Sequence, residues 1–171
     1  MYITSTVRWT HDGAQISLTQ KSDYPFDGAV KFELESSKPA EFAIHLRIPG
    51  WADGALISIN GKRESSSVAA GQFAMLRRTW KNGDRVEVDL PMKLRLKSLD
   101  PQHPQIVALL CGPLVLFAIT EAAPLVTTQQ LLAAKKTGQR SWQVETATRP
   151  MTMLPFTVIT DQQYSTYVLA T

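Results

Sequence analysis

The sequence has a single cysteine, no long apolar run and no concentrated basic segment. With Cys111 alone, the 171-residue chain can form neither an internal disulfide nor a zinc site built from several cysteines. Its longest apolar stretch, residues 106–119, is shorter than the ~20 residues of a membrane span. The 18 basic and 15 acidic residues are scattered, whereas nucleic-acid-binding proteins concentrate basic residues on one face. We therefore expect no disulfide, no membrane span and no nucleic-acid partner.

We expect no signal peptide at the start of this sequence, because the strand-like residues Tyr2 and Ile3 follow Met1 directly. A chain that enters a strand at its second residue is expected to be part of a longer protein. Its composition, with 44% hydrophobic and 19% charged residues, is typical of folded proteins. We expect a soluble protein of bacterial type, and the sequence leaves its compartment open between the cytoplasm and export.

Short segments in which apolar and polar side chains alternate fill much of the first hundred residues. Residues 30–35 (VKFELE) show the pattern, and residues 42–48 and 86–90 repeat it. A period of two places one row of side chains against a core and the other toward solvent. Turn signals such as Asp12-Gly13 and Asn60-Gly61 predict hairpins between these segments. The sequence therefore predicts an all-β fold: an antiparallel β-sandwich with jelly-roll or immunoglobulin-like layering.

The pattern changes near residue 98. We expect a β-sandwich domain over residues 1–97, and over residues 98–171 either a second, smaller β unit or strands that complete the sandwich. The segments 106–110 and 114–119 are apolar on both faces, so the strands they form are expected to be covered on both sides.

One short helix is predicted near residues 127–136. Thr127 or Thr128 can cap its N-terminus, its two lysines suit its C-terminal end, and Gly138 ends it. Strands are predicted over residues 142–146, 151–159 and 164–169.

Residues that could carry out catalysis are few. His11, His45 and His103 lie in a turn, on the polar row of a strand and between prolines, and none has a catalytic motif around it. Cys111 lies in an apolar run, where a buried thiol behaves as a small hydrophobic group. We interpret all four as structural or surface residues.

Two pairs of carboxylates could resemble the pair that a glycosidase uses. Glu33 and Glu35 share one face of a strand, and so do Glu87 and Asp89. Each pair stands on the polar row of a regular amphipathic strand, which favours a solvated face. The glycines occur singly in turns and form no phosphate loop. We therefore predict no catalytic residue and no metal ligand in this chain.

Among the aromatic residues, Trp51 is the best candidate for contact with a carbohydrate. It lies in a loop after Pro49-Gly50, where an indole could stack on a sugar ring. Large aromatic side chains more often serve packing, so an anchor that closes the end of the sandwich is the favoured interpretation. Trp80 is expected to cover the edge of the core.

Several motifs occur in order along the chain: residues 46–52 (LRIPGWA), 57–61 (ISING), 80–84 (WKNGD) and 86–92 (VEVDLPM), flanked by 2–5 (YITS), 23–28 (DYPFDG), 112–115 (GPLV), 154–156 (LPF) and 164–167 (YSTY). Together they resemble the region that follows the catalytic domain in β-L-arabinofuranosidase-like glycoside hydrolases, family 127 and its relatives. The family usually has proline where this sequence has Thr4. The resemblance covers nearly the whole chain.

The resemblance implies a catalytic (α/α) barrel on the N-terminal side of these strands. In the family this barrel carries a zinc ion held by cysteines and a glutamate, a cysteine nucleophile and a glutamate acid/base. No residue of this sequence matches those motifs, and Cys111 lies in the sandwich region, where the family commonly has other residues. We thus expect no cofactor in this chain and no activity of the chain alone.

Three functions remain open from the sequence. The first is a non-catalytic C-terminal β region that braces the catalytic barrel of a glycoside hydrolase and contributes to the substrate entrance or to a homodimer contact. The second is a carbohydrate-binding module that holds arabinose-containing or other plant glycans through Trp51. The third is an immunoglobulin-like adhesion or linker module, which leaves the ordered motifs unexplained.

Overall fold

A computed structural model describes residues 2–64, 68–121 and 125–171. The chain divides into two compact units, Met1–Met92 and Lys93–Thr171. Within the described residues, the only helical elements are α1 (Thr128–Leu132) and the single 3₁₀ turn η1 (Phe156–Val158). None of these helices is long and apolar enough to cross a membrane. The predicted all-β class is confirmed.

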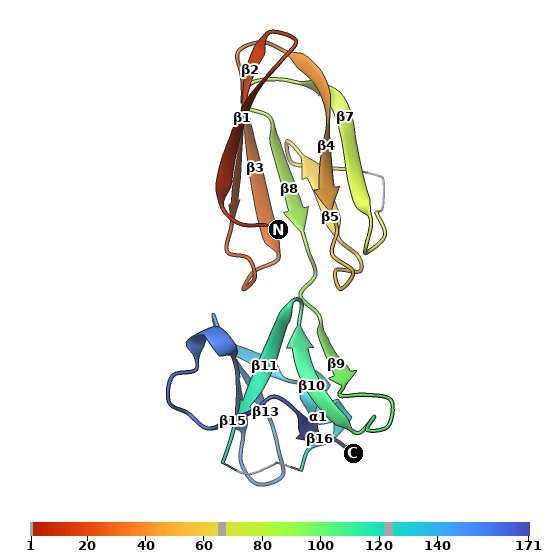
Figure 1. Ribbon diagram of the computed structural model, residues 1–171, viewed down its shortest axis with the longest axis vertical. Helices are drawn as coiled ribbons and strands as arrows, with labels where there is room; N and C mark the ends of the chain where they lie inside the picture. The colour runs from red at the N-terminus through yellow and green to blue at the C-terminus, as the bar shows by residue number, and fades with distance from the viewer. Residues whose placement is uncertain (1, 65–67, 122–124) are drawn as a thin grey trace. The chain divides into compact units, whose positions relative to one another are not determined.

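The first unit is an antiparallel β-sandwich with sheets of unequal width (Figure 1). The larger sheet has the order β1-β2-β3-β8-β5-β6, and β4 pairs with β7 in the smaller one. The strands of this unit are β1 (Ser5–His11), β2 (Ala14–Ser22), β3 (Ala29–Ser36), β4 (Ala40–Arg47), β5 (Leu56–Ile59), β6 (Lys62–Arg63), β7 (Phe73–Trp80) and β8 (Arg85–Asp89).

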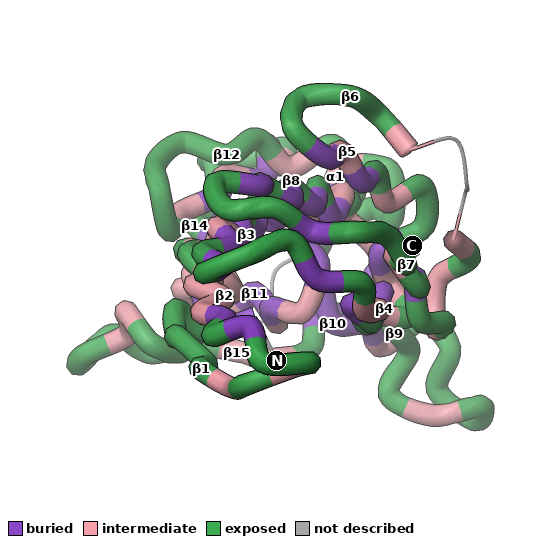
Figure 2. The backbone as a smooth tube through the Cα atoms, turned by 90° about the horizontal axis from the view of Figure 1, so that it is seen from above, coloured by how far each residue is buried: buried purple, intermediate pink, exposed green. Residues whose placement is uncertain are grey.

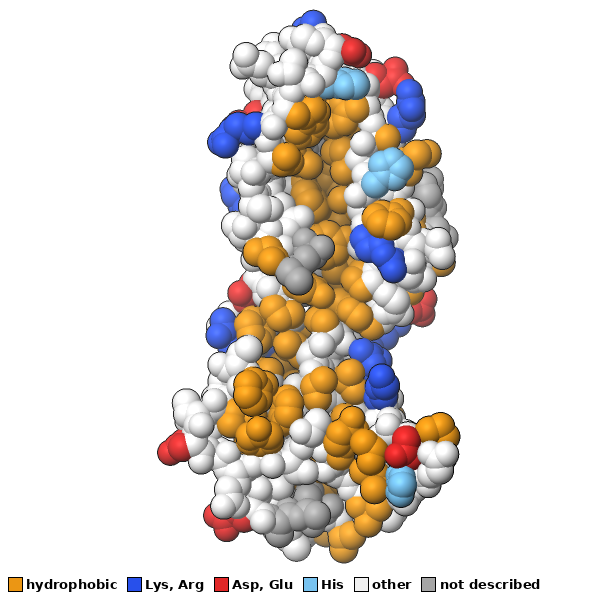
Figure 3. All heavy atoms as spheres, in the orientation of Figure 1, with side chains coloured by type: hydrophobic (Ala, Val, Ile, Leu, Met, Phe, Trp, Pro, Cys, Tyr) orange, Lys and Arg blue, Asp and Glu red, His pale blue; other side chains and the backbone are white. Residues whose placement is uncertain are grey.

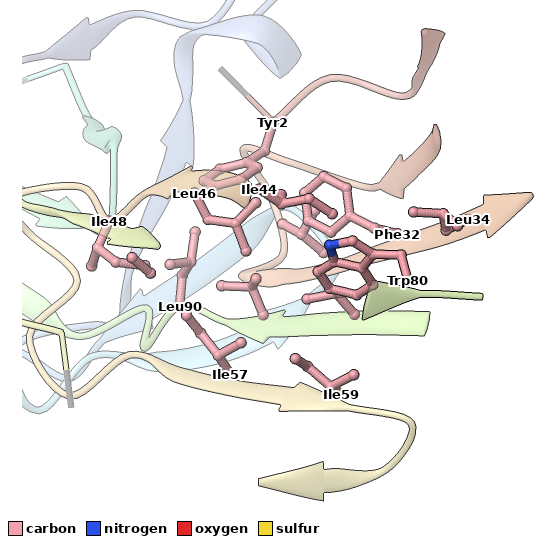
Figure 4. Close-up of a cluster of buried hydrophobic side chains, with 14 of the residues drawn as sticks. Tyr2, Phe32, Leu34, Ile44, Leu46, Ile48, Ile57, Ile59, Trp80 and Leu90 are labelled. Carbon is pink, nitrogen blue, oxygen red and sulfur yellow. The ribbon is translucent and has the colours of Figure 1, made fainter. Parts of the chain in front are cut away.

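The predicted alternation of side chains builds the core of this unit. On β3 the side chains of Val30, Phe32 and Leu34 are buried, and the charged residues between them lie toward the outer face. Figure 4 shows how Phe32 and Leu34 meet residues of the smaller sheet, such as Ile44 and Trp80. Burial of these apolar side chains is the main contribution to the stability of the sandwich.

Two tight turns form where the sequence predicts hairpins. Asp12 (φ 48°) and Gly13 (φ 72°) join β1 to β2, and Asn60 (φ 52°) and Gly61 (φ 77°) join β5 to β6. Positive φ at both central residues is typical of a type I′ turn, whose twist matches that of the strands it joins. In Figure 2 the loop that carries β6 is exposed along most of its length.

The second unit is built on an antiparallel sheet of order β12-β13-β14-β11-β10-β16, in which β9 also pairs with β10 and β15 with β11. Residues 107–111 are all buried, so β10 is covered on both faces as predicted, whereas β11 has only alternate residues buried. The strands are β9 (Leu94–Ser98), β10 (Ile106–Cys111), β11 (Leu114–Ile119), β12 (Lys135–Gly138), β13 (Ser141–Val144), β14 (Met151–Pro155), β15 (Tyr164–Ser165) and β16 (Val168–Leu169).

The predicted boundary of the first domain, after residue 97, falls inside β9. In the structure β9 pairs with β10 along its whole length, from Leu94–Cys111 to Ser98–Val107. This strand is therefore part of the second unit's sheet. Its alternating pattern resembles that of the preceding strands, and the sequence alone does not show with which strand it pairs.

The helix α1 is shorter than the predicted segment 127–136. Thr127 caps its N-terminus, and Gln130 completes a capping box with it. The helix ends at Leu132, because Lys135 and Lys136 belong to β12 and pair with β13. The ammonium group of Lys136 lies 5.5 Å from the centre of the Trp142 ring, a contact that favours the strand over another helical turn.

The last predicted strand, residues 164–169, is divided into two. Tyr164 and Ser165 form β15 and pair with β11, whereas Val168 and Leu169 form β16 and pair with β10. Between them the Ser165 hydroxyl donates a hydrogen bond to the carbonyl of Tyr167. This local bond bends the chain between the two short strands.

Candidate functional site

Trp51 lies in the loop between β4 and β5 and is half-buried. Its ring stacks on that of Tyr24, with 6.5 Å between centres and 20° between planes. Tyr24 in turn contacts Tyr2 edge-on at 6.1 Å. Trp51 is thus the outermost member of an aromatic series that leads into the core. This arrangement suits a packing anchor, and part of the indole remains accessible.

Tyr2 fixes this aromatic series to the smaller sheet. Its hydroxyl donates a hydrogen bond of 2.6 Å to the carbonyl oxygen of Arg47. Burial, together with the nearby Tyr24, raises the pKa of Tyr2 to about 12. The phenol therefore stays neutral at physiological pH and acts as a structural donor.

The two carboxylate pairs lie on the outer face of the larger sheet, and one member of each pair lies beside a lysine. Lys21 donates a hydrogen bond of 2.7 Å to Glu33, and this bond together with the charge lowers the pKa of Glu33. Glu87 lies 3.9 Å from Lys31. A glycosidase acid needs a carboxyl group with a raised pKa, so Glu33 does not suit that role.

The histidines do not form a nucleophile–base system with the groups they contact. The ring nitrogen Nε2 of His11 lies 3.0 Å from the carbonyl of Glu41, and Nδ1 of His103 lies 2.9 Å from Asp100. His103 and Asp100 have the geometry of a base and its orienting group. The nearby hydroxyl of Ser98 donates to the carbonyl of Pro104 instead.

Cys111 is buried at the C-terminal end of β10. Burial raises the pKa of its thiol, against a smaller opposing effect of Lys136. Nucleophilic cysteines are accessible and have a lowered pKa. The thiol therefore has the environment of a core residue.

The described residues do not fit the zinc site that the family resemblance implies. Such a site needs about four ligands drawn from cysteine, histidine and carboxylate side chains. Over residues 2–64, 68–121 and 125–171, no three side chains of these types come together in a way that could hold a metal ion.

Two shallow hollows occur in the first unit that the sequence did not indicate. One, of about 530 Å³, lies along β1, β2 and β3 and includes Arg8, Trp9 and Glu35 in its lining. The other, of about 340 Å³, lies across β3, β5 and β8 and includes Lys31 and Glu87. Their linings come from neighbouring strands, so only knowledge of strand pairing could have revealed them.

The fold and these side chains define a β-rich accessory region. Residues 1–92, more than half of the chain, match the family model described as β-L-arabinofuranosidase, GH127 middle domain. The chain therefore belongs to this family, as the sequence motifs predicted. The match assigns the first unit to the middle domain of the family.

Solved structures share the fold over the whole length of the chain. A GH127 β-L-arabinofuranosidase from Geobacillus stearothermophilus T6 has a TM-score of 0.79 at 21% identity and covers 100% of this chain. A GH127 β-arabinofuranosidase has a TM-score of 0.70 at 20% identity, also over 100% of the chain. This chain spans only 33% and 34% of those proteins. A comparison with curated proteins gives no match.

Proposed function

We propose that this chain is the non-catalytic β region of an arabinofuranosidase-type glycoside hydrolase, and that it braces a catalytic barrel formed by another part of the same protein. The family match and the threefold greater length of the similar structures support this proposal. The zinc ion and the reacting residues would then belong to that other part. The β-L-arabinofuranoside substrate named for the relatives would be the substrate of the whole protein.

The observation that carries the proposal is an exposed cluster of three aromatic rings in the second unit, formed by Phe117, Phe156 and Tyr164. The ring of Tyr164 lies 5.3 Å from that of Phe117 and 6.2 Å from that of Phe156, both edge-on. Phe156 remains 61% exposed and Tyr164 45% exposed. Exposed apolar clusters are typical of surfaces that bind a protein, a membrane or a ligand. The greater length of the similar structures favours a covering surface from the same protein.

A substitution in this aromatic cluster tests the proposal. Phe156→Ser should lower the unfolding temperature of the full-length protein by several degrees, because burial of one phenylalanine contributes about 1.5–3 kcal/mol. The same substitution in the isolated chain should have a much smaller effect, because the ring is mostly exposed there. Leu99→Ser, at another exposed apolar residue of the second unit, serves as the control. Equal shifts for Phe156→Ser in both proteins would contradict a covered cluster.

A second candidate function is glycan binding, which the partly accessible indole of Trp51 and its parallel neighbour Tyr24 favour. It predicts that the isolated chain binds arabinan-type oligosaccharides with measurable heat and that Trp51→Ala abolishes the signal. Isothermal titration calorimetry decides this. A flat titration of the wild-type chain across several glycans would remove the candidate.

A further inference from the structure

One part of the sandwich interior in the first unit lies open. On the inner face of the larger sheet, Val7, Leu18 and Leu34 stand directly opposite one another on β1, β2 and β3. Leu34 is 2% exposed, Leu18 is half-buried and Val7 is 54% exposed. Burial therefore falls steadily toward β1. Figure 3 shows hydrophobic side chains along the trough between the two sheets of this unit.

Val7 belongs to the interior row and not to the solvent-facing one. Trp9, two residues further along β1 and so on the same face, is paired with Ile16, which is 2% exposed. Val7 is thus exposed although it faces the interior. The smaller sheet has only β4 and β7, so among the described strands no further one extends it over β1.

On the side away from β7, the backbone groups of β4 face this trough and have no partner strand among the described residues. The carbonyl of Glu41 accepts a hydrogen bond from Nε2 of His11, and that of Arg47 accepts one from the Tyr2 hydroxyl. Both carbonyls therefore point away from β7. Because the direction of backbone groups alternates along an antiparallel strand, the N–H and C=O groups of Ala43 and His45 point the same way. Among the described strands, only β7 pairs with β4.

We propose that this edge of β4 binds a short extended segment from the part of the longer protein that lies outside this chain. The segment would widen the smaller sheet to three strands and cover Val7 and Leu18. The inference rests on the proposed function, because it takes the rest of the same protein as the partner. The lengths of the similar structures, of which this chain spans about a third, provide that partner.

The length of the open edge of β4 sets the length of the segment that can pair with it. His11 and Tyr2 close its two ends at Glu41 and Arg47, six residues apart, which corresponds to about 20 Å of strand. A strand of about five residues fits this length. Its alternate side chains should be apolar toward Val7 and Leu18 and polar toward solvent. Strand addition of this kind uses backbone hydrogen bonds for affinity and alternate side chains for specificity.

Hydrogen–deuterium exchange tests the proposal on the wild-type protein. In the isolated chain, the amides of Ala43 and His45 should exchange nearly as fast as in an unstructured peptide, and that of Ile44, which points toward β7, should be protected. In the full-length protein, exchange at Ala43 and His45 should slow by about 100-fold or more. Equal exchange at these two amides in both proteins would overturn the proposal. If these two amides become protected in the isolated chain as its concentration rises, the proposal is also overturned, because the edge of β4 then pairs with a second copy of this chain.

A pair of substitutions separates strand pairing from simple coverage of the surface. Ala43→Pro removes an N–H that points away from β7, so it should leave the β4–β7 ladder intact and block an added strand. In the full-length protein it should raise exchange at His45 by about 10-fold or more, whereas Ala43→Thr, which keeps the N–H, should not. Unchanged protection at His45 in the proline variant would exclude the added strand.

The two proposals fail in different ways. If the full-length protein loses activity when the first unit is destabilised but exchange at Ala43 and His45 is unchanged, the added strand is wrong and the bracing function stands. If activity does not respond to destabilisation of the first unit, the bracing function itself is wrong.

Discussion

Asp84 connects two turns of the first unit through its buried carboxylate. Its oxygens accept hydrogen bonds from the side-chain amide of Asn60 and the backbone N–H of Lys81, both at 2.8 Å. Asn60 in turn accepts one from the N–H of Arg85. The turn between β5 and β6 is thereby fixed to the turn between β7 and β8.

The charge of Asp84 makes the stability of this unit depend on pH. Burial acts to raise the pKa of Asp84, but the hydrogen bonds from Asn60 and Lys81 outweigh it and hold the pKa below its usual value. A lowered pKa in the folded state contributes stability that is present above the unfolded value of about 3.9 and is lost as the pH falls through the folded value.

Asp84→Asn should therefore destabilise the chain at pH 7 by about 1–3 kcal/mol, because a charge-assisted acceptor is lost. It should also flatten the decrease in stability below pH 4. Urea unfolding between pH 2 and 7 measures both effects. Asp89→Asn, at an exposed carboxylate on β8, is the control. A variant as stable as wild type at pH 7 and equally sensitive to acid would contradict the role given to Asp84.

Single residues show which contacts the sequence can predict. Trp80 was expected to cover the edge of the core, and it is fully buried, with its indole N–H bonded to the carbonyl of Phe42 at 3.0 Å. Its burial follows from local alternation on β7. The bond to Phe42, 38 residues away, depends on the pairing of β4 with β7, which no local pattern indicates.

At the scale of elements, Gly28 lies just before β3, where the backbone closely approaches the residue that follows β8. A Cβ atom at this position would lie 2.0 Å from the carbonyl oxygen of Leu90. The N–H of Leu90 donates to the carbonyl of Gly28 at 3.1 Å. Only glycine allows this approach without a shift of one strand relative to the other.

Gly28→Ala should destabilise the first unit by about 1–3 kcal/mol, because the added methyl group forces the two backbones apart. Chemical unfolding of the isolated chain measures the loss. The control is Gly50→Ala, since a Cβ atom there would have no neighbour within 4 Å. Equal stabilities of the two variants would show that the approach at Leu90 relaxes at little cost.

The sequence predicts correctly the turns that depend on neighbouring residues only. It does not predict the bounds of elements that depend on pairing with a distant strand. The turns at Asp12-Gly13 and Asn60-Gly61 need only two residues with positive φ. Lys135 and Lys136 fit a helix end as well as a strand, and their pairing with β13 decides between the two. The candidate site shows the same limit: Trp51 was chosen from its loop, but its stacking on Tyr24 appears only when the chain is folded. The open edge of β4 likewise appears only when the sheets are assembled.

At the scale of the whole molecule, the chain is a family member that spans about a third of the similar structures. The described residues form two β units with buried cores, and neither brings together a nucleophile, a base and an orienting group among the described contacts. The proposed role is therefore mechanical: the β region would stabilise a catalytic domain by packing against it.

Thermal inactivation of the full-length protein tests this role most directly. Glycosidase activity is measured after heating for wild type, Gly28→Ala and Gly50→Ala. If the β region braces the catalytic barrel, Gly28→Ala should lower the temperature of half-inactivation by several degrees, as expected for a loss of about 1–3 kcal/mol, and Gly50→Ala should match wild type. Inactivation of Gly28→Ala at the wild-type temperature, with the first unit shown to unfold earlier, would contradict the account.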